Sequence, residues 1–455
     1  MSFSSAGRTL VSSSTQSSPQ IQEGEEMDQV TTEWNGIEDT IEDPEEVRVI
    51  FCALDSYLQY GKTAHFNSTH LRRQAFYALP QEHWQMLAAP PFNYLDTLDR
   101  VDEAIEKNAE LARVIVANGL RSFHMTAVDD DDDDDAPPSA RREPVLHRPW
   151  QGCAKYQDID KARSTLRQFY RDWTAAGAAE RDACYGPVLR ALAAARDDRA
   201  GGAAGGPEAA ATTTMTKVLV PGAGLGRLVF ELCMAGFEVE GNEISYHQLL
   251  ASSYMLNCCE RAAKHTVYPW ISSFSNHATR AHHLRGYAVP DVHCATALAG
   301  PRARPGGSMT MCAADFLCLY GDAQHAGAYD AVATVFFLDT APNLVRYLQT
   351  IRHCLRPGGL LVNVGPLLWH FENSAPGLHA HDDEGGGGAT SGIADPGSFE
   401  LADDEVMALV ARLGFDVVTR ETGIEAPYIR DAQSMLQTVY KASFWVAQKV
   451  ETEPS

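Results

Sequence analysis

The sequence contains no cysteine pair in C-x-x-C spacing, no apolar run of 18 residues and no excess of basic residues. Its ten cysteines are scattered between Cys52 and Cys354, so neither a zinc ribbon nor a disulfide framework is indicated, and a reducing compartment is expected. Sixty acidic against 37 basic residues give a net charge of −23, which argues against a nucleic-acid partner held through phosphate contacts. The N-terminus lacks the apolar core of a secretory signal. We therefore expect no nucleic-acid or membrane partner and an intracellular protein, with the cytoplasm as first candidate and the nucleus as second.

Composition divides the 455 residues into four parts. Residues 1–43 are Ser/Gln-rich and then acidic, which predicts a disordered tail because little apolar surface is available for burial. Residues 44–127 carry helical patterns, and residues 128–147, which include seven consecutive aspartates, are interpreted as an acidic flexible linker. Residues 148–449 form the main domain, with low-complexity inserts near 197–215, 301–307 and 380–398.

Two helices are expected in residues 44–127. The first begins near Pro44 and has apolar residues at helical spacing: Val47, Ile50, Phe51, Leu54 and Leu58. The second has a stripe running from Leu98 to Val116 and is expected to stop at Asn118-Gly119. These patterns predict a helical N-terminal subdomain.

From Lys217 onward, strand and helix patterns alternate. Seven strands are expected, in "KVLVPGAG", "FEVEGNE", "MTMCAADF", "YDAVATVFFLD", "GGLLVNVGP", "FDVVTRE" and "YKASFWVAQK". This alternation is typical of an α/β fold in which a mostly parallel sheet is covered by helices on both faces. Ligands of such sheets bind beyond the carboxyl ends of the strands.

The first of these strands ends in a glycine turn with Gly222, Gly224 and Gly226 in G-x-G-x-G order. The dinucleotide fingerprint is instead G-x-G-x-x-G. Glu243 lies 17 residues beyond Gly226, where the second strand should end and where a carboxylate can accept both ribose hydroxyls of a nucleoside. Such a turn alone is often only a tight connection, but the turn and the acid together favour an S-adenosyl-L-methionine pocket over an NAD pocket.

Asp315 and Phe316 end the third strand. There the acid can accept the adenine amino group, and the aromatic side chain can cover the adenine ring.

Several longer motifs carry a specific resemblance. The stretches "QFYRDWTAAGAAERDACYGPV", "VLVPGAGLGRLVFEL", "GFEVEGNEISY", "YPWISSFSN", "FFLDTAPN", "LRPGGLLVNVGPLLWHFEN" and "PYIRDAQSM" resemble the carnosine N-methyltransferase family, from about Pro44 to Lys449. The resemblance implies a Rossmann-like, S-adenosyl-L-methionine-dependent methyltransferase with a helical N-terminal extension. The implied reaction transfers a methyl group to an imidazole ring nitrogen of carnosine, giving anserine.

The resemblance also implies site residues. The cofactor contacts fall on Gln168, Arg171, Gly222, Glu243, Asp315 and Phe316, to which the glycine turn adds Gly224 and Gly226. Gln168 and Arg171 lie three apart in an expected helix, hence on one face, where they could reach the methionine carboxylate. Without the family they would be an ordinary exposed pair.

The implied acceptor contacts are Asp339, His370 and Tyr428. An imidazole near pH 7 needs its tautomer fixed more than it needs a strong base, so we assign Asp339 the acceptance of one ring N–H. His370 and Tyr428 would orient the ring or the polar ends of the dipeptide. Asp339 could instead be a helix N-cap, and the segment "HAHDDEGGGGATSG" after His370 departs from the family pattern.

Alternatives remain open at this stage. The same fold could methylate a histidine of a protein or peptide, or it could be a non-catalytic nucleoside-binding scaffold; an NAD-linked oxidoreductase fits the glycine spacing poorly. The expected partner is a small imidazole dipeptide such as carnosine or a histidine-containing peptide, and a homodimer is left open. No metal site is expected, since His282, His283, His379 and His381 lack ligand spacing and are interpreted as surface residues.

Overall fold

The computed structural model describes residues 8–9, 13–14, 44–122, 150–202, 217–373 and 397–450. The expected linker 128–147, most of the tail 1–43, His379 and His381 lie outside these residues. Within the tail, β1 (Arg8–Thr9) and β2 (Ser13–Ser14) pair antiparallel with β7 (Ser308–Ala313). No helix among the described residues is long and apolar enough to cross a membrane.

A single sheet organises the main part of the chain, in the order β1-β7-β4-β3-β8-β9-β11-β10. Along the run β7-β4-β3-β8-β9 all pairings are parallel, and the strands other than β7 are β3 (Lys217–Pro221), β4 (Glu238–Glu243), β8 (Tyr329–Val335) and β9 (Leu355–Gly365). Beyond β9, β11 (Val439–Lys449) runs antiparallel to both β9 and β10 (Phe415–Pro427). All seven expected strands are confirmed, and a small hairpin of β5 (His265–Val267) and β6 (Tyr287–Val289) was not expected.

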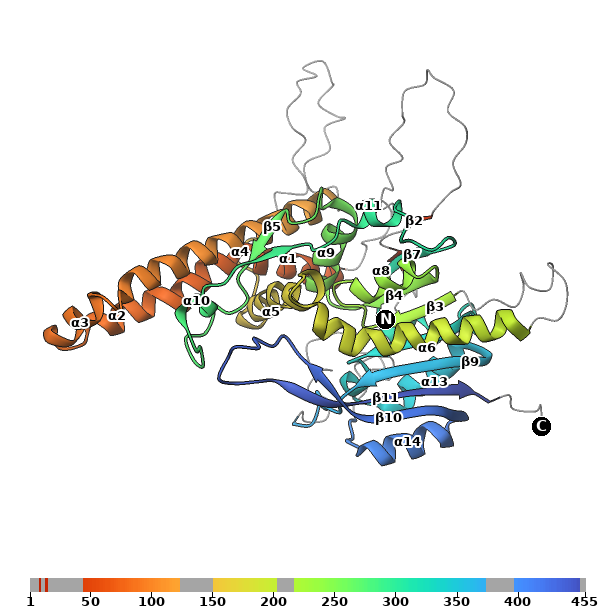
Figure 1. Ribbon diagram of the computed structural model, residues 1–455. Coiled ribbons are helices and arrows are strands. Elements are labelled where there is room, and N and C mark those ends of the chain that lie inside the picture. The colour runs from red at the N-terminus through yellow and green to blue at the C-terminus, as the bar shows by residue number, and fades with distance from the viewer. Residues whose placement is uncertain are drawn as a thin grey trace, which may run out of the picture.

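The central strands β3 and β8 are buried on both faces, which explains why they read as nearly continuous apolar runs, whereas the edge strand β10 is largely exposed. In β3, Val218 and Val220 join one hydrophobic cluster while Leu219 joins the other. Helices α5 (Tyr156–Trp173), α6 (Ala178–Gly202), α8 (Arg227–Met234) and α9 (Tyr246–Ser253) contribute to the first cluster. Helices α12 (Phe316–Leu319), α13 (Leu344–Cys354) and α14 (Asp403–Arg412) contribute to the second. The predicted α/β class, with helices on both faces, is confirmed (Figure 1).

Short helical segments complete the described chain. They are η3 (Tyr254–Cys258), α10 (Arg280–His283), α11 (Cys294–Leu298) and η4 (Leu338–Thr340).

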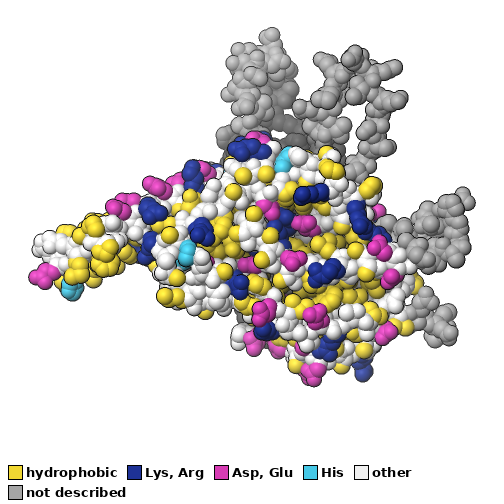
Figure 2. Space-filling view, in the orientation of Figure 1, with side chains coloured by type: hydrophobic (Ala, Val, Ile, Leu, Met, Phe, Trp, Pro, Cys, Tyr) yellow, Lys and Arg dark blue, Asp and Glu magenta, His cyan; other side chains and the backbone are white. Residues whose placement is uncertain are grey.

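The N-terminal helices form an arm that extends away from the sheet (Figure 1). This arm consists of α1 (Pro44–His65), the π-helical turn η1 (Phe66–His70), α2 (Leu71–Tyr77), α3 (Gln81–Ala88) and α4 (Tyr94–Ser122). Glu45 and Glu46 occupy the first turn of α1, where acids interact favourably with the helix dipole. Leu54 and Ile105 belong to the same cluster as Val220, so the arm and the sheet share one core. Figure 2 shows apolar side chains along the arm, and the exposed ones include Phe66, Leu71, Tyr77, Leu79, Met86 and Phe92.

Three sequence-based expectations were wrong in detail. Helix α4 does not stop at Asn118-Gly119 but continues to Ser122, because Gly119 serves close packing: an added Cβ would lie 2.7 Å from Leu250 Cδ2. Leu58 is exposed rather than part of the buried stripe. Residues 197–202 of the expected flexible insert are the last turns of α6.

Candidate active site

The glycine turn follows β3 at the carboxyl edge of the sheet, next to the point where the strand order reverses between β3 and β8. Gly222, Gly224 and Gly226 have φ values of +67°, +57° and +75°, a region that L side chains rarely adopt. A Cβ on Gly222 would lie 2.6 Å from Phe337 Cδ2. A Cβ on Gly224 would meet nothing closer than Gln248 Oε1 at 3.8 Å. The turn is therefore closed at Gly222 and open at Gly224.

Glu243 ends β4 beside this turn and is only 9% exposed. Its carboxylate accepts the backbone N–H groups of Gly224, Ile244 and Ser245, each at 2.9 Å. Burial raises the pKa of Glu243, and these three N–H groups oppose the rise. No Lys or Arg in the described part of the chain forms an ion pair with this carboxylate. Glu243 thus ties the turn to β4 while its charge stays without a cationic partner.

Two glutamines line the same region. Gln248 of α9 donates from Nε2 to Gln168 Oε1 of α5 at 2.6 Å. Gln248 Oε1 is buried and accepts no hydrogen bond among the described residues. A buried acceptor without a partner is unfavourable unless a ligand or water supplies a donor. Gln248 was not found from the sequence; its place in the helix that follows Glu243 was the available signal.

Arg171 lies near the end of α5, and its guanidinium forms a two-point ion pair with Asp172. Nε donates to Oδ1 at 2.8 Å and Nη2 donates to Oδ2 at 2.9 Å. Burial alone would lower the pKa of Arg171, but the Asp172 carboxylate outweighs it, so the pKa lies well above its usual value. The same guanidinium lies 5.2 Å from the ring centroid of Tyr428. This contact joins a predicted cofactor residue to a predicted acceptor residue.

Asp315 and Phe316 follow β7. Asp315 caps α12 by accepting the N–H of Leu317 at 2.8 Å and of Cys318 at 3.2 Å. The Phe316 ring is buried and packs edge-on against Phe337, with centroids 5.5 Å apart. Phe337 also closes the turn at Gly222, so Phe316, Phe337 and the glycine turn meet at one place.

Asp339 lies in η4 after β8 and is 3% exposed. Its Oδ2 accepts the Leu368 N–H at 2.9 Å, and its backbone carbonyl accepts the His370 N–H at 3.2 Å. Burial raises the pKa of Asp339, while the Leu368 N–H and the nearby His370 act against the rise. Asp339 does not cap the following helix, because Asn343 is the N-cap of α13. The His370 side chain is exposed at the edge of this site.

Aromatic rings stand beside Asp339. Phe336 contacts Tyr428 at a centroid distance of 5.4 Å and Tyr440 at 5.7 Å. Phe336 has φ +54°, a strained conformation for a bulky residue and one that clusters at functional sites. The Tyr440 ring also lies 6.2 Å from that of Tyr428, and burial raises the pKa of Tyr440, with Tyr428 and Asp339 adding to the rise. Neither Phe336 nor Tyr440 was found from the sequence, because only tertiary pairing brings β8 and β11 to this point.

The predicted residues therefore form two adjoining groups. Gln168, Glu243, Asp315, Phe316 and the three glycines surround the turn; Asp339, His370 and Tyr428 lie beyond β8; Arg171 contacts Tyr428 between them. The expectation for His283 was wrong: it is not a surface residue but fully buried, with Nδ1 accepting from Arg280 Nη1 at 2.7 Å.

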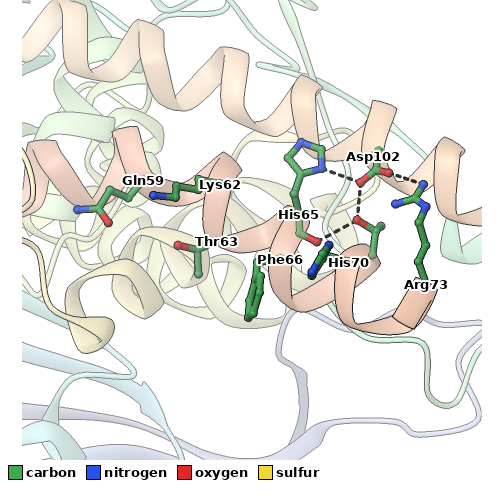
Figure 3. Close-up of a pocket in the computed structure, with 9 residues that line it drawn as sticks. Gln59, Lys62, Thr63, His65, Phe66, His70, Arg73 and Asp102 are labelled. Atoms are coloured by element: carbon green, nitrogen blue, oxygen red, sulfur yellow. Dashed lines mark hydrogen bonds and ion pairs between the residues drawn. The ribbon is translucent and has the colours of Figure 1, made fainter. Parts of the chain in front are cut away.

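A separate hollow of about 550 Å³ lies on the arm, between α1, η1, α2 and α4 (Figure 3). Both ring nitrogens of His65 face carboxylates there, Asp102 at 2.6 Å and Glu106 at 2.7 Å. Burial would lower the pKa of His65, but these two acids raise it above its usual value. Arg73 also pairs with Asp102, at 2.7 Å. None of the predicted site residues lines it.

Comparison with known proteins identifies the family. Residues 148–451 match the family model described as carnosine N-methyltransferase. A carnosine N-methyltransferase of Schizosaccharomyces pombe is 32% identical over 407 residues, covering 89% of this chain and 97% of that protein. The Mus musculus carnosine N-methyltransferase is 32% identical over 397 residues, with 87% and 84% covered. A Drosophila melanogaster relative, "Carnosine N-methyltransferase unmet", is 35% identical over 291 residues, with 64% and 56% covered. The chain therefore belongs to the carnosine N-methyltransferase family and is a methyltransferase that uses S-adenosyl-L-methionine.

Proposed function

We propose that this methyltransferase methylates an imidazole ring nitrogen of carnosine, giving anserine, or of a closely related histidine-containing dipeptide. One observation carries the proposal: the Asp339 carboxylate is 3% exposed, has a backbone N–H as its hydrogen-bonding partner, and lies beside aromatic side chains. A planar heterocycle with one N–H fits such a place. The aromatic side chains can pack against the faces of the heterocycle, while the carboxylate accepts a hydrogen bond from its N–H group.

The residues around the glycine turn fit the cofactor. Gly224 leaves open space at the turn, and Glu243 and Gln248 Oε1 offer buried acceptors to hydroxyl or amino donors. Arg171 and Gln168 would hold the methionine end, and Asp315 and Phe316 the adenine. When bound, S-adenosyl-L-methionine supplies an electrophilic methyl group on its sulfur.

The protein's own groups then do little covalent chemistry. Asp339 accepts one ring N–H of the acceptor, which fixes the tautomer so that the other ring nitrogen carries the lone pair. Its negative charge also stabilises the imidazolium that forms as the methyl arrives. His370 and Tyr428 orient the ring and the dipeptide. Positioning of this kind supplies most of the rate enhancement in a direct displacement.

A histidine of a larger peptide is the second candidate. Leu368, whose N–H binds Asp339, has a side chain that is 51% exposed, and Met435, beyond Tyr428, is 75% exposed. Apolar side chains at these positions would contact residues flanking a peptide histidine.

An acceptor panel distinguishes the two. Purified protein is incubated with labelled S-adenosyl-L-methionine and carnosine, homocarnosine, free histidine or a histidine-containing peptide. Product mass and ring-proton NMR rank the acceptors and locate the methyl group. We expect carnosine to give the highest kcat/KM; a peptide that exceeds it would overturn the proposed substrate.

We also propose a homodimer and a location in the cytoplasm and nucleus. The exposed apolar side chains of the arm support the homodimer. Light scattering on the full chain tests the dimer, and fractionation of cells tests the location.

A further inference from the structure

The N-terminal turns of α6 contact both groups of the site. Tyr185 Oη donates to Asp172 Oδ1 at 2.9 Å, the same oxygen that accepts Arg171 Nε at 2.8 Å. Asp172 is 1% exposed, so its carboxylate is held between the Tyr185 hydroxyl and the guanidinium of Arg171. Arg181, also on α6, donates from Nη1 to the backbone carbonyl of Arg171 at 2.7 Å. Helix α6 therefore fixes both the backbone and the side chain of Arg171.

Glu180, which directly precedes Arg181 on α6, binds the segment that carries Tyr428. Its Oε2 accepts the Ile429 N–H and its Oε1 accepts the Arg430 N–H, both at 2.8 Å. Glu180 is 5% exposed, so both bonds are shielded from water. Ile429 has φ +45°, which is unfavourable for a β-branched residue and persists only where the surroundings hold it. Glu180 thus stabilises a strained backbone immediately after Tyr428.

We propose that α6 positions the two halves of the active site through two separate residues. Tyr185, acting through Asp172, orients Arg171 for the cofactor, and Glu180 orients Tyr428 for the methyl acceptor. The inference rests on the proposed function, since Arg171 and Tyr428 are assigned there. Tyr185 and Glu180 are positioning residues that touch neither ligand.

A purely structural role for both residues predicts a different pattern. Removal of a buried hydrogen bond would then lower stability and change cofactor and acceptor parameters together. Separate positioning predicts that each variant changes one parameter and leaves the other.

The experiment is a crossed comparison of Tyr185→Phe and Glu180→Gln. Calorimetry measures the Kd of S-adenosyl-L-homocysteine, and initial rates at saturating cofactor measure the KM of carnosine. Tyr185→Phe should raise that Kd about tenfold, from loss of a hydrogen bond to a charged group, with an unchanged carnosine KM. Glu180→Gln presents an amide NH₂ to one of the two N–H donors, and it should raise the carnosine KM about tenfold with an unchanged Kd.

The arm supplies matched controls. Tyr60→Phe removes a buried phenol that accepts from Asn108 Nδ2 at 3.0 Å. Asp55→Asn changes a buried carboxylate that accepts the N–H groups of Gly152 at 3.0 Å and Ala154 at 2.8 Å. Both controls perturb a buried hydrogen-bonding side chain of the arm, away from the site, so they should lower the unfolding midpoint and leave Kd and KM unchanged.

The proposal is overturned if Tyr185→Phe binds S-adenosyl-L-homocysteine as tightly as wild type, if Glu180→Gln keeps the wild-type KM, or if either variant changes both parameters equally. Should Glu180→Gln fail to fold, Glu180→Asp retains the charge but is too short to reach both N–H groups, and it must raise KM in the same way. Should wild type methylate the peptide instead of carnosine, the proposed substrate fails. The Tyr185 half is then still read from Kd, and the Glu180 half from the KM of the peptide.

Discussion

Gly224→Ala tests whether the glycine turn admits a bound nucleoside. At φ +57° an alanine costs about 1–2 kcal/mol, partly offset by about 0.4–1 kcal/mol because alanine restricts the unfolded chain. No protein atom lies within 3.8 Å of the new methyl group, so no steric term is added. The free energy of unfolding should fall by only about 1 kcal/mol. If a nucleoside occupies that open space, the methyl group should weaken binding of S-adenosyl-L-homocysteine by about tenfold or more, since overpacking costs about 1–3 kcal/mol.

Two further glycines serve as comparisons. Gly423→Ala has a similar conformation, φ +76°, with no atom within 4 Å, and it should lose the same stability with no effect on binding. Gly222→Ala adds a clash with Phe337 at 2.6 Å and should lose about 3 kcal/mol. Calorimetry gives the binding constants and urea unfolding gives the stabilities. Wild-type affinity in a folded Gly224→Ala protein would refute the assignment of this turn to the cofactor.

Three other perturbations test the site and the core. Asp339→Asn should lower kcat/KM by about a hundredfold, because the charge that stabilises the imidazolium is lost. It should raise the unfolding midpoint, because the fold raises the pKa of this buried acid and so disfavours its ionised form. Equal losses of activity and stability would contradict this. In wild type, kcat/KM should fall as the pH is lowered, since Asp339 must be ionised and the acceptor imidazole, with a pKa of about 6.5, must be neutral. Because burial raises the pKa of Asp339, its limb should lie above the pH of an ordinary aspartate and be missing from the Asp339→Asn profile. Gly119→Ala should lower stability by about 1 kcal/mol although alanine favours helices, since the new Cβ would meet Leu250 at 2.7 Å and Leu54 at 2.9 Å; a gain in stability on urea unfolding would show that these leucines move aside freely.

The sheet could be predicted from the sequence because its central strands β3 and β8 are short apolar runs bounded by turn residues. Local sequence patterns set the ends of these strands. Val218 and Leu219 face different hydrophobic clusters, so both faces of β3 require apolar residues and its sequence does not alternate between apolar and polar. Gly119 shows where local reasoning fails, since its helix-breaking preference is overridden by packing between α4, α1 and α9. A single sequence does not reveal which glycine serves a turn and which a close contact.

The site divides in the same way. Gly222, Gly224, Gly226 and Glu243 lie within one strand–helix–strand unit, so spacing alone could group them. Phe336 and Tyr440 lie in distant elements, and Tyr440 reaches Asp339 only because β11 inserts antiparallel between β9 and β10. Glu180 and Tyr185 were hidden for another reason: in sequence they are ordinary polar residues of a helix, and their role depends on what α6 packs against.

Glu243 and Asp339 together suggest why the site is built around uncompensated acids. Both are buried, burial raises both pKa values, and no Lys or Arg of the described chain pairs with either. Burying a carboxylate without a cation is unfavourable for folding, and backbone N–H groups offset this only in part. A cationic partner would stabilise the fold but would occupy the oxygens that a ligand's hydroxyl or ring N–H must reach. The unpaired state therefore serves binding rather than stability. It predicts that neutralising either acid weakens one ligand: the cofactor at Glu243, the acceptor at Asp339.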